Sequence, residues 1–254
     1  MLPEKRLSEI KNVIDAKKSC SINEIAGMFN ISKATVRRDL KMLADRDVIR
    51  LTRGGAMSIA SGTTYDPPYA MKKDLNHDEK KRIAKRAAEL VNDGETLVID
   101  SGSTMLEFAR ALRSFKQVTV ATNDLIVAYE LANVKSIDLT FVGGSIRKNF
   151  YASHGYFAQM ALEQINSDKA FLGIDALDYT KGCMVTNMEE LVIKKLMLTS
   201  AKERIVLCDH SKFYNVAFLK LCELAQINRI ITGYELDEKI YRHIADEGVH
   251  IERV

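Results

Sequence analysis

Short apolar runs alternate with amphipathic helical patterns from residue 96 onward. The runs are TLVID, QVTVAT, IDLTFVG, KAFLGID, RIVLCD and RIITG. Helical patterns such as MLEFARAL, DLIVAYEL and MEELVIKKLMLTSA lie between them. This alternation predicts an α/β domain with a mostly parallel sheet covered by helices. Ligands of such domains bind at the carboxyl ends of the strands, so a site is expected there.

The first 58 residues differ from the rest in charge. They hold 12 Lys and Arg against 7 Asp and Glu, whereas the remaining residues hold 25 against 27. A small basic module on a near-neutral body is typical of nucleic-acid binding, although an ordinary solvated surface can show the same imbalance. The helical pattern of this segment favours nucleic-acid binding.

Three helices are predicted in the basic segment. Apolar residues recur at helical spacing across residues 7–14, which predicts the first helix. A capping box of Ser21 and Glu24 predicts the start of a short second helix that ends near Asn30. The third begins at Ser32, and its apolar stripe leaves basic and hydroxyl-bearing residues on another face.

Two short helices joined by a tight turn form the layout of a helix-turn-helix, whose second helix enters the major groove of double-stranded DNA. The segment VIRLTRGGAMSI then predicts two short strands around a Gly-Gly turn, which is a wing. Phosphate and base contacts are expected from the cations and the hydroxyl of this surface. These residues are Lys33, Thr35, Arg37, Arg38, Lys41, Arg50 and Arg53. A solvated face on a helical hairpin is the alternative.

This stretch resembles the DeoR family of bacterial transcriptional regulators. The resemblance rests on TVRRDL at residues 35–40 and on Gly-Gly-Ala at residues 54–56, at the spacing of that family. The sequence departs from the family at Asp47, where Gly is frequent, and at Leu51 and Arg53, where a basic residue and His are usual. The resemblance implies a winged helix that binds operator DNA.

Small polar residues and two of the three prolines gather in residues 57–75, which predicts a connector. We therefore expect a DNA-binding domain at 1–58, a linker at 59–75 and an effector-binding domain at 76–254. Asn76 is expected to cap a helix through HDEKKRIAKRAAELV whose Lys and Arg side chains lie in solvent. His77 has no partner at metal-ligand spacing, so no metal site is expected.

Polar, glycine-rich loops follow four predicted strands of this domain. In DSGST, residues 100–104, backbone N–H groups at a helix start and hydroxyls can hold a phosphate. The other strands end in TND at 122–124, in GGS at 143–145 followed by Arg147 and Lys148, and in Asp209 with Lys212 nearby. Each loop alone is readily a plain turn, but four together favour a pocket for an anion.

The DeoR resemblance extends across this domain. The family's sensor domain is similar in fold to ribose-5-phosphate isomerase and CoA transferases, and its Asp-x-Gly-Ser-Thr loop binds a phosphorylated sugar. The resemblance thus implies an effector site at Asp100, Gly102, Ser103, Thr104, Thr122, Asn123, Gly143, Gly144, Lys194, Asp209, Ser211, Lys212 and Phe213. Upstream of the helix lysine the family commonly has Glu where this chain has Val192, so the sugar-facing end is expected to differ.

An aldose–ketose phosphate isomerase with an accessory DNA-binding domain is the main alternative. Such an enzyme needs a carboxylate or similar group within reach of its substrate. The candidates are Asp175, Glu189, Glu190 and Asp209, and none lies in a recognisable catalytic motif. His154 and His210 lack the paired nucleophile and orienting group of acyl transfer. A constitutive DNA-bound protein, whose second domain only supports an oligomer, is a third hypothesis.

The sequence as a whole favours a non-enzymatic repressor of a carbohydrate-metabolism operon, controlled by a phosphorylated sugar and without a cofactor. Paired operator half-sites favour a homo-oligomer, a dimer or a tetramer. No apolar run is long enough for a membrane span and the N-terminus is charged, so a cytoplasmic protein is expected. The four scattered cysteines are expected to be buried free thiols. The operator, the sugar, the direction of its effect and the number of subunits stay open.

Overall fold

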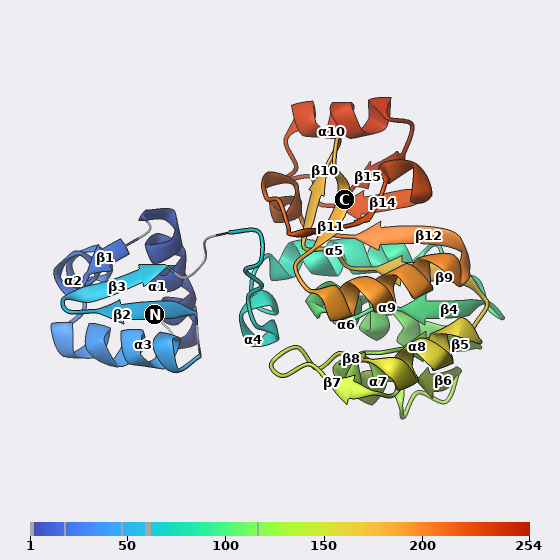
Figure 1. Cartoon of the computed structure of the whole chain (residues 1–254), viewed down its shortest axis with the longest axis horizontal. Helices are drawn as coiled ribbons and strands as arrows, with labels where there is room; N and C mark the ends of the chain where they lie inside the picture. Colours follow the sequence, from blue (N-terminus) through green and yellow to red (C-terminus); the bar gives the residue numbers. More distant parts are fainter. Residues whose placement is uncertain (1–2, 18, 47, 59–61, 116) are drawn as a thin grey trace. The chain divides into compact units, whose positions relative to one another are not determined.

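The computed structural model describes residues 3–17, 19–46, 48–58, 62–115 and 117–254 (Figure 1). The chain divides into two compact units, Met1–Met71 and Lys72–Val254. The division falls within the segment expected to be a linker. Asp47, where the sequence departs from the DeoR pattern, lies outside the described residues.

Up to residue 58, the described residues of the first unit form three helices and a small antiparallel sheet. The helices are α1 (Pro3–Lys17), α2 (Ile22–Phe29) and α3 (Lys33–Asp45), and the strands β1 (Ser19–Ser21), β2 (Ile49–Thr52) and β3 (Gly55–Ser58) pair in the order β1-β3-β2. The predicted helix starts are confirmed: Ser21 and Glu24 form a capping box, and Ser32 caps α3 by accepting from the N–H of Thr35. β1 was not predicted, because three polar or small residues show no strand pattern.

The core of this unit explains part of the TVRRDL segment. Val36 and Leu40 are fully buried or nearly so among the apolar residues of α1 and α2. Asp39 is buried too, and its carboxylate accepts two hydrogen bonds from Arg6 of α1, at 2.7 and 3.1 Å. Half of the segment thus fixes α3 against α1, which leaves Thr35, Arg37 and Arg38 for other roles.

The wing turn differs from the predicted Gly-Gly turn. Its two loop residues are Arg53 and Gly54, because Thr52 and Gly55 already pair as the last residues of β2 and β3. Gly55 is a strand residue whose backbone lies directly against that of β1. Its lack of a side chain serves this close approach and not the turn itself.

The second unit is built on a seven-stranded sheet in which every pair of neighbours is parallel. Its strands are β4 (Thr96–Ile99), β5 (Val118–Thr122), β6 (Ile137–Phe141), β9 (Ser167–Leu172), β12 (Ala201–Leu207), β14 (Arg229–Thr232) and β15 (His250–Arg253). They lie in the order β15-β14-β12-β9-β4-β5-β6. The predicted α/β architecture is confirmed.

Helices cover both faces of this sheet (Figure 1). One face packs against α5 (His77–Ala88), α6 (Ser103–Ala111) and α7 (Leu125–Leu131), and the other against α8 (Tyr156–Glu163), α9 (Met188–Thr199) and α10 (Glu238–Asp246). The short helices are α4 (Tyr69–Lys72), η1 (Leu112–Ser114), η2 (His210–Tyr214) and η3 (Leu224–Gln226). No helix among the described residues is long and apolar enough to cross a membrane.

Two small antiparallel sheets were not predicted. One consists of β10 (Ala176–Asp178), β11 (Gly182–Val185) and β13 (Leu219–Cys222), and the other of β7 (Ser145–Ile146) and β8 (Ser153–His154). Strands this short carry almost no periodic signal, so the sequence pattern does not reveal them. All four cysteines are buried and free, as expected.

The helix after the linker departs from expectation in two ways. Asn76 precedes α5 but does not cap it with its side chain, which donates to the carboxylate of Asp209 at 2.9 Å. Lys80 is only 3% exposed, although the Lys and Arg side chains of this helix were expected in solvent. Its ammonium group donates to the carbonyl oxygens of Lys72 and Leu75. Tertiary contacts have drawn a charged side chain into the interior.

We predict that Gly55→Ala destabilises the first unit by about 2 kcal/mol or more, because overpacking against a rigid backbone cannot relax. A Cβ atom there would lie 2.7 Å from the Cα of Ser21 and would overlap the carbonyl oxygen of Cys20. Gly54→Ala is the matched control, since its Cβ would meet nothing within 4 Å. Urea dependence of amide hydrogen exchange within residues 3–58 reports on this unit alone. Equal effects of the two substitutions would contradict this account.

Candidate functional site

The order in which successive strands are added to the sheet reverses at β4. From this strand the chain builds outward to β5 and β6 on one side, and later to β9, β12, β14 and β15 on the other. The loops that follow β4 and β9 therefore diverge at the carboxyl edge, and the crevice between such loops is where open α/β sheets bind ligands. Asp100 follows β4 directly, and Gly173 follows β9.

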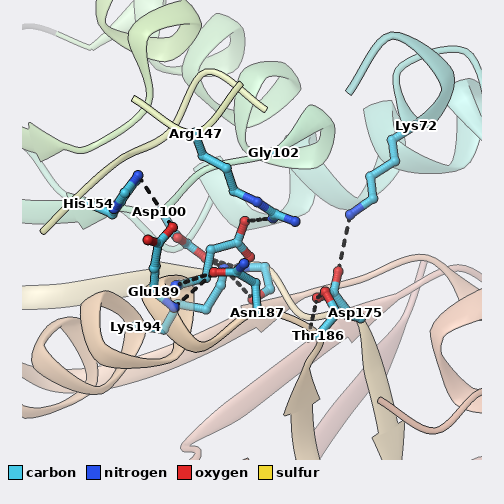
Figure 2. A network of polar contacts seen from close by, with 12 residues as sticks. Lys72, Asp100, Gly102, Arg147, His154, Asp175, Thr186, Asn187, Glu189 and Lys194 are labelled. Carbon is cyan, nitrogen blue, oxygen red and sulfur yellow. Dashed lines mark hydrogen bonds and ion pairs between the residues drawn. The ribbon is translucent and has the colours of Figure 1, made fainter. Parts of the chain in front are cut away.

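A buried ion pair spans this crevice (Figure 2). The carboxylate of Asp100 pairs through Oδ2 with the ammonium of Lys194 on α9, and the same oxygen accepts from the N–H of Gly173 at 2.9 Å. Lys194 also donates to the carbonyl oxygen of Gly173 at 3.0 Å. Asp100 and Lys194 are 1% and 4% exposed. Burial lowers the pKa of Lys194, but the negative charges of Asp100 and Glu190 outweigh it and the net shift is upward.

The loop after β4 leads into α6 through a residue in the left-handed region. Gly102 has φ of 126°, and its N–H donates to the carboxylate of Asp124 at 3.0 Å. The other oxygen of Asp124 caps α7 by accepting from the N–H groups of Ile126 and Val127. Burial raises the pKa of Asp124 to about 6, although these hydrogen bonds oppose the shift.

The first turn of α6 remains able to bind an anion. Its leading amides, at Ser103 and Thr104, have no intrahelical acceptor, and the helix dipole favours negative charge there. The Ser103 side chain is 8% exposed, and its hydroxyl donates to the carbonyl oxygen of Lys72 at 3.3 Å. Thr104 is half-buried. The geometry thus provides N–H groups and hydroxyls, whereas the carboxylate of Asp100 is directed at Lys194.

The loops after β5 and β6 shape the crevice from one side. Asn123 is 2% exposed and donates to the carbonyl oxygen of Ser153 at 3.0 Å, and Thr122 accepts from the N–H of Asp124. A Cβ at Gly144 would overlap the carbonyl oxygen of His154, whereas one at Gly143 would meet nothing within 4 Å. Gly144 therefore serves packing, whereas the position of Gly143 has room for a side chain.

The predicted residues after β12 lie on the other side. Asp209 starts η2 by accepting from the N–H and hydroxyl of Ser211. Burial raises the pKa of Asp209, but the charge of Lys212 and the hydrogen bond of Ser211 bring it below its usual value. Phe213 is buried beneath this turn. Lys212 is half-buried, so its charge is available near the crevice.

Asp175 lies near the positive charges of several lysines. It was not among the residues expected to bind the effector. One oxygen pairs with the ammonium of Lys72 at 3.1 Å, and the other accepts from the N–H and hydroxyl of Thr186 at 2.9 and 3.0 Å (Figure 2). Burial raises the pKa of Asp175, but Lys72, Lys212 and Lys194 outweigh it and hold that pKa well below its usual range. Lys72 was missed because it lies in a segment expected to be a linker.

The segment between β7 and β8 brings another cation to the crevice. Arg147 pairs with Glu190 of α9, and its guanidinium lies 3.5 Å from the centroid of the Phe150 ring. The ammonium of Lys72 lies 5.7 Å from the same centroid. Figure 2 draws Arg147 in the same network of polar contacts as Asp100 and Lys194. The sequence flagged Arg147 only as a neighbour of the Gly143-Gly144 turn.

The residues expected to bind DNA form a separate set in the first unit. Those on α3 and the wing, namely Lys33, Arg37, Arg38, Lys41, Arg50 and Arg53, are exposed and make no ion pair with any described residue. Thr35 is half-buried, with its hydroxyl 2.9 Å from that of Ser32. Arg6 and Arg46, in contrast, pair with Asp39 and Glu4. The structure thus separates cations that hold the unit together from cations that face outward.

Comparison with known families covers both units. Residues 6–62 match the DeoR-like helix-turn-helix domain, and residues 75–234 match the DeoR C terminal sensor domain. The chain belongs to the DeoR family. It is therefore a transcriptional regulator that binds DNA through its helix-turn-helix and a small molecule through its sensor domain.

Curated DeoR-family relatives align along nearly the whole chain. The HTH-type transcriptional regulator GlpR of Haloferax volcanii is 32% identical over 99% of this chain and 98% of its own. A putative aga operon transcriptional repressor of Escherichia coli O157:H7 is 30% identical over 92% and 87%. The glycerol-3-phosphate regulon repressor of Haemophilus influenzae is 30% identical over 95% and 93%.

Solved structures similar to this DeoR-family chain are more distant. Ribose 5-phosphate isomerase A from Methanocaldococcus jannaschii is 23% identical with a TM-score of 0.41, covering 54% of this chain and 55% of its own. The chain thus spans about half the length of that structure. The probable sor operon regulator from Shigella flexneri is 12% identical with a TM-score of 0.44, covering 68% and 89%.

We predict that Lys194→Met lowers the free energy of unfolding of the second unit by about 3–5 kcal/mol, because it leaves the Asp100 carboxylate buried without its counter-charge. Asp100→Asn is expected to be destabilising as well, since it leaves the ammonium unpaired. The double variant should be more stable than the sum of the two losses implies, by a coupling energy that urea unfolding measures. Additive losses would show that the two charges do not depend on each other.

Proposed function

We propose that this DeoR-family regulator represses a carbohydrate-metabolism operon, and that a phosphorylated sugar bound at the carboxyl edge of its sheet controls its affinity for operator DNA. The observation that carries this proposal is the first turn of α6. Its leading amides have no intrahelical acceptor, and the Ser103 hydroxyl donates to the carbonyl oxygen of Lys72, whose ammonium pairs with Asp175. Together they provide the donors and the positive charge that a phosphate monoester needs.

The effector site in this proposal comprises the loops at the crevice. Its members are Asp100, Gly102, Ser103, Thr104, Asn123, Gly143, Gly144, Lys194, Asp209 and Lys212. Their roles differ: Asp100, Asn123, Gly144 and Asp209 hold neighbouring segments in place, and Ser103, Thr104 and Lys212 are the candidates for direct contact. The printed names of two relatives, which refer to the aga operon and to glycerol 3-phosphate, support a ligand of this class.

DNA binding is assigned to residues 1–58, with 59–75 as linker and 76–254 as the effector-binding domain. The outward cations of α3 and the wing are positioned for phosphates and base edges, as in other winged helices. The described part of the chain contains one such unit, whereas paired half-sites require two. We therefore infer that the regulator acts as a homo-oligomer, a dimer or a tetramer.

No catalytic role is proposed for the crevice. A general base must be free to take a proton from the substrate, and the four carboxylates considered are engaged elsewhere. Asp175 is held by Lys72 and Thr186, and Glu190 by Arg147. Asp209 caps η2, and Glu189 lies 3.4 Å from His154. Asp124, with a pKa of about 6, has both oxygens occupied by backbone N–H groups.

The effector can change DNA affinity only through its own preference for one of two states of the protein. A phosphate that prefers the DNA-free state releases the operator, and one that prefers the bound state acts as a co-repressor. The same coupling makes operator DNA change the affinity for the sugar phosphate by an equal factor.

We predict that Arg37→Ala with Arg38→Ala weakens DNA binding and flattens its salt dependence. Each lost phosphate contact should reduce the slope of log affinity against log salt by about 1. Fluorescence anisotropy with a duplex selected by the protein from a random library measures this slope. Lys5→Ala with Lys17→Ala removes the same charge from exposed positions of α1 and should alter it less. An unchanged slope in the arginine variant would remove these residues from the phosphate contacts.

We predict that Ser103→Ala with Thr104→Ala abolishes the effector response while DNA binding persists. A thermal-shift screen of aldose, ketose and polyol phosphates, including glycerol 3-phosphate, identifies ligands, and the unphosphorylated compounds are the control for the phosphate. Thr119→Ala removes an exposed hydroxyl of β5 near the opposite edge and should leave the response intact. No stabilisation of the wild type by any phosphate would refute the effector class. A normal response of the double variant would refute the site.

A further inference from the structure

Lys72 connects the effector crevice to the linker. It is the last residue of α4 and the first residue of the second unit. Its ammonium pairs with Asp175 at 3.1 Å, and its carbonyl oxygen accepts from the hydroxyl of Ser103 at 3.3 Å. Both contacts are made within the second unit. The segment that leads to the DNA-binding unit is thus tied to the crevice at its end.

Both contacts involve groups that a phosphate also binds. The Ser103 hydroxyl has one proton to donate, so donating to a phosphate oxygen breaks its bond to the Lys72 carbonyl. The Lys72 ammonium is a mobile point charge on a flexible stem, and phosphate is a stronger partner for it than a carboxylate shared with other lysines. A phosphate at the start of α6 therefore competes for both partners at once.

The groups that Lys72 would leave keep other partners. Its carbonyl oxygen also accepts from the ammonium of Lys80, which is buried beside it. Asp175 keeps the two hydrogen bonds from Thr186 and the nearby charges of Lys212 and Lys194. The Lys72 carbonyl thus keeps a hydrogen-bond donor. On Asp175 only Oδ1 loses its bonded partner, and the surrounding positive charge remains, which limits the cost of an unsatisfied buried group. The exchange is therefore energetically accessible to a small ligand.

We propose that Lys72 is a residue of the effector site, and that a bound phosphate takes the Lys72 ammonium from Asp175 and the Ser103 hydroxyl from the Lys72 carbonyl. The end of α4 then loses these two contacts with the crevice, and residues 69–76 change their position or their freedom when the effector binds. This inference rests on the proposed function and adds the route by which the crevice acts on the linker.

The test compares Lys72→Met with Lys73→Met, an exposed neighbour that carries the same charge. Inorganic phosphate and glycerol 3-phosphate are the probes, and calorimetric titration gives their affinities. Lys72→Met should weaken both by about tenfold or more, since a hydrogen-bonded charge pair is lost. Lys72→Arg should retain most of the affinity, and Lys73→Met should match the wild type. Thermal unfolding without ligand verifies that each variant is folded.

Hydrogen exchange of residues 69–76 tests the second half of the proposal. Phosphate should change the exchange of this segment in the wild type and in Lys73→Met, but much less in Lys72→Met at equal occupancy. Wild-type affinity in Lys72→Met, or an unchanged segment at saturating phosphate, would overturn the role of Lys72 while the effector class stands. Failure of the wild type to bind either probe or any sugar phosphate would overturn the proposed function together with this inference.

Discussion

The buried pair of Asp100 and Lys194 is the interaction on which the carboxyl edge of the sheet depends. It joins the loop after β4, the loop after β9 through Gly173, and helix α9. These segments otherwise diverge, because the sheet builds outward in opposite directions from β4. Burying two charges costs several kcal/mol for each, so the pair is poorly explained as a source of stability alone. It anchors the first residue of the loop that leads from β4 into α6, which begins at Ser103.

Around this pair, cations that line the crevice form ion pairs with carboxylates. Asp175 is shared among several lysines, and Arg147 is paired with Glu190. The carboxylates neutralise cations that would otherwise repel one another. An anionic ligand that takes over part of this neutralisation changes which groups are paired with each cation. Such an arrangement is suited to sensing, because the ligand binds only as existing ion pairs within the protein rearrange.

The sequence predicted what depends on local period and on topology. Apolar runs predicted the strands, and a parallel sheet necessarily brings their polar ends to one edge. What it could not predict depends on partners far along the chain. Asp100 matches a ligand-binding motif, yet its carboxylate is directed at a lysine 94 residues away. Lys72 and Lys80 were read as linker and solvent-facing residues, because only their tertiary contacts with Asp175 and with backbone carbonyls draw them inward.

The two units use acidic residues in the same way. In the first, Asp39 within TVRRDL is buried against Arg6 and orients α3, so that Arg37 and Arg38 on the two preceding positions face outward. In the second, Asp100 binds Lys194 and orients the start of α6, so that its amides and hydroxyls face the crevice. In both motifs the acidic carboxylate is held by a cation of the same unit. Replacing this residue would therefore affect ligand binding through the element that it orients. A residue that determines the fold can for this reason appear within a binding motif.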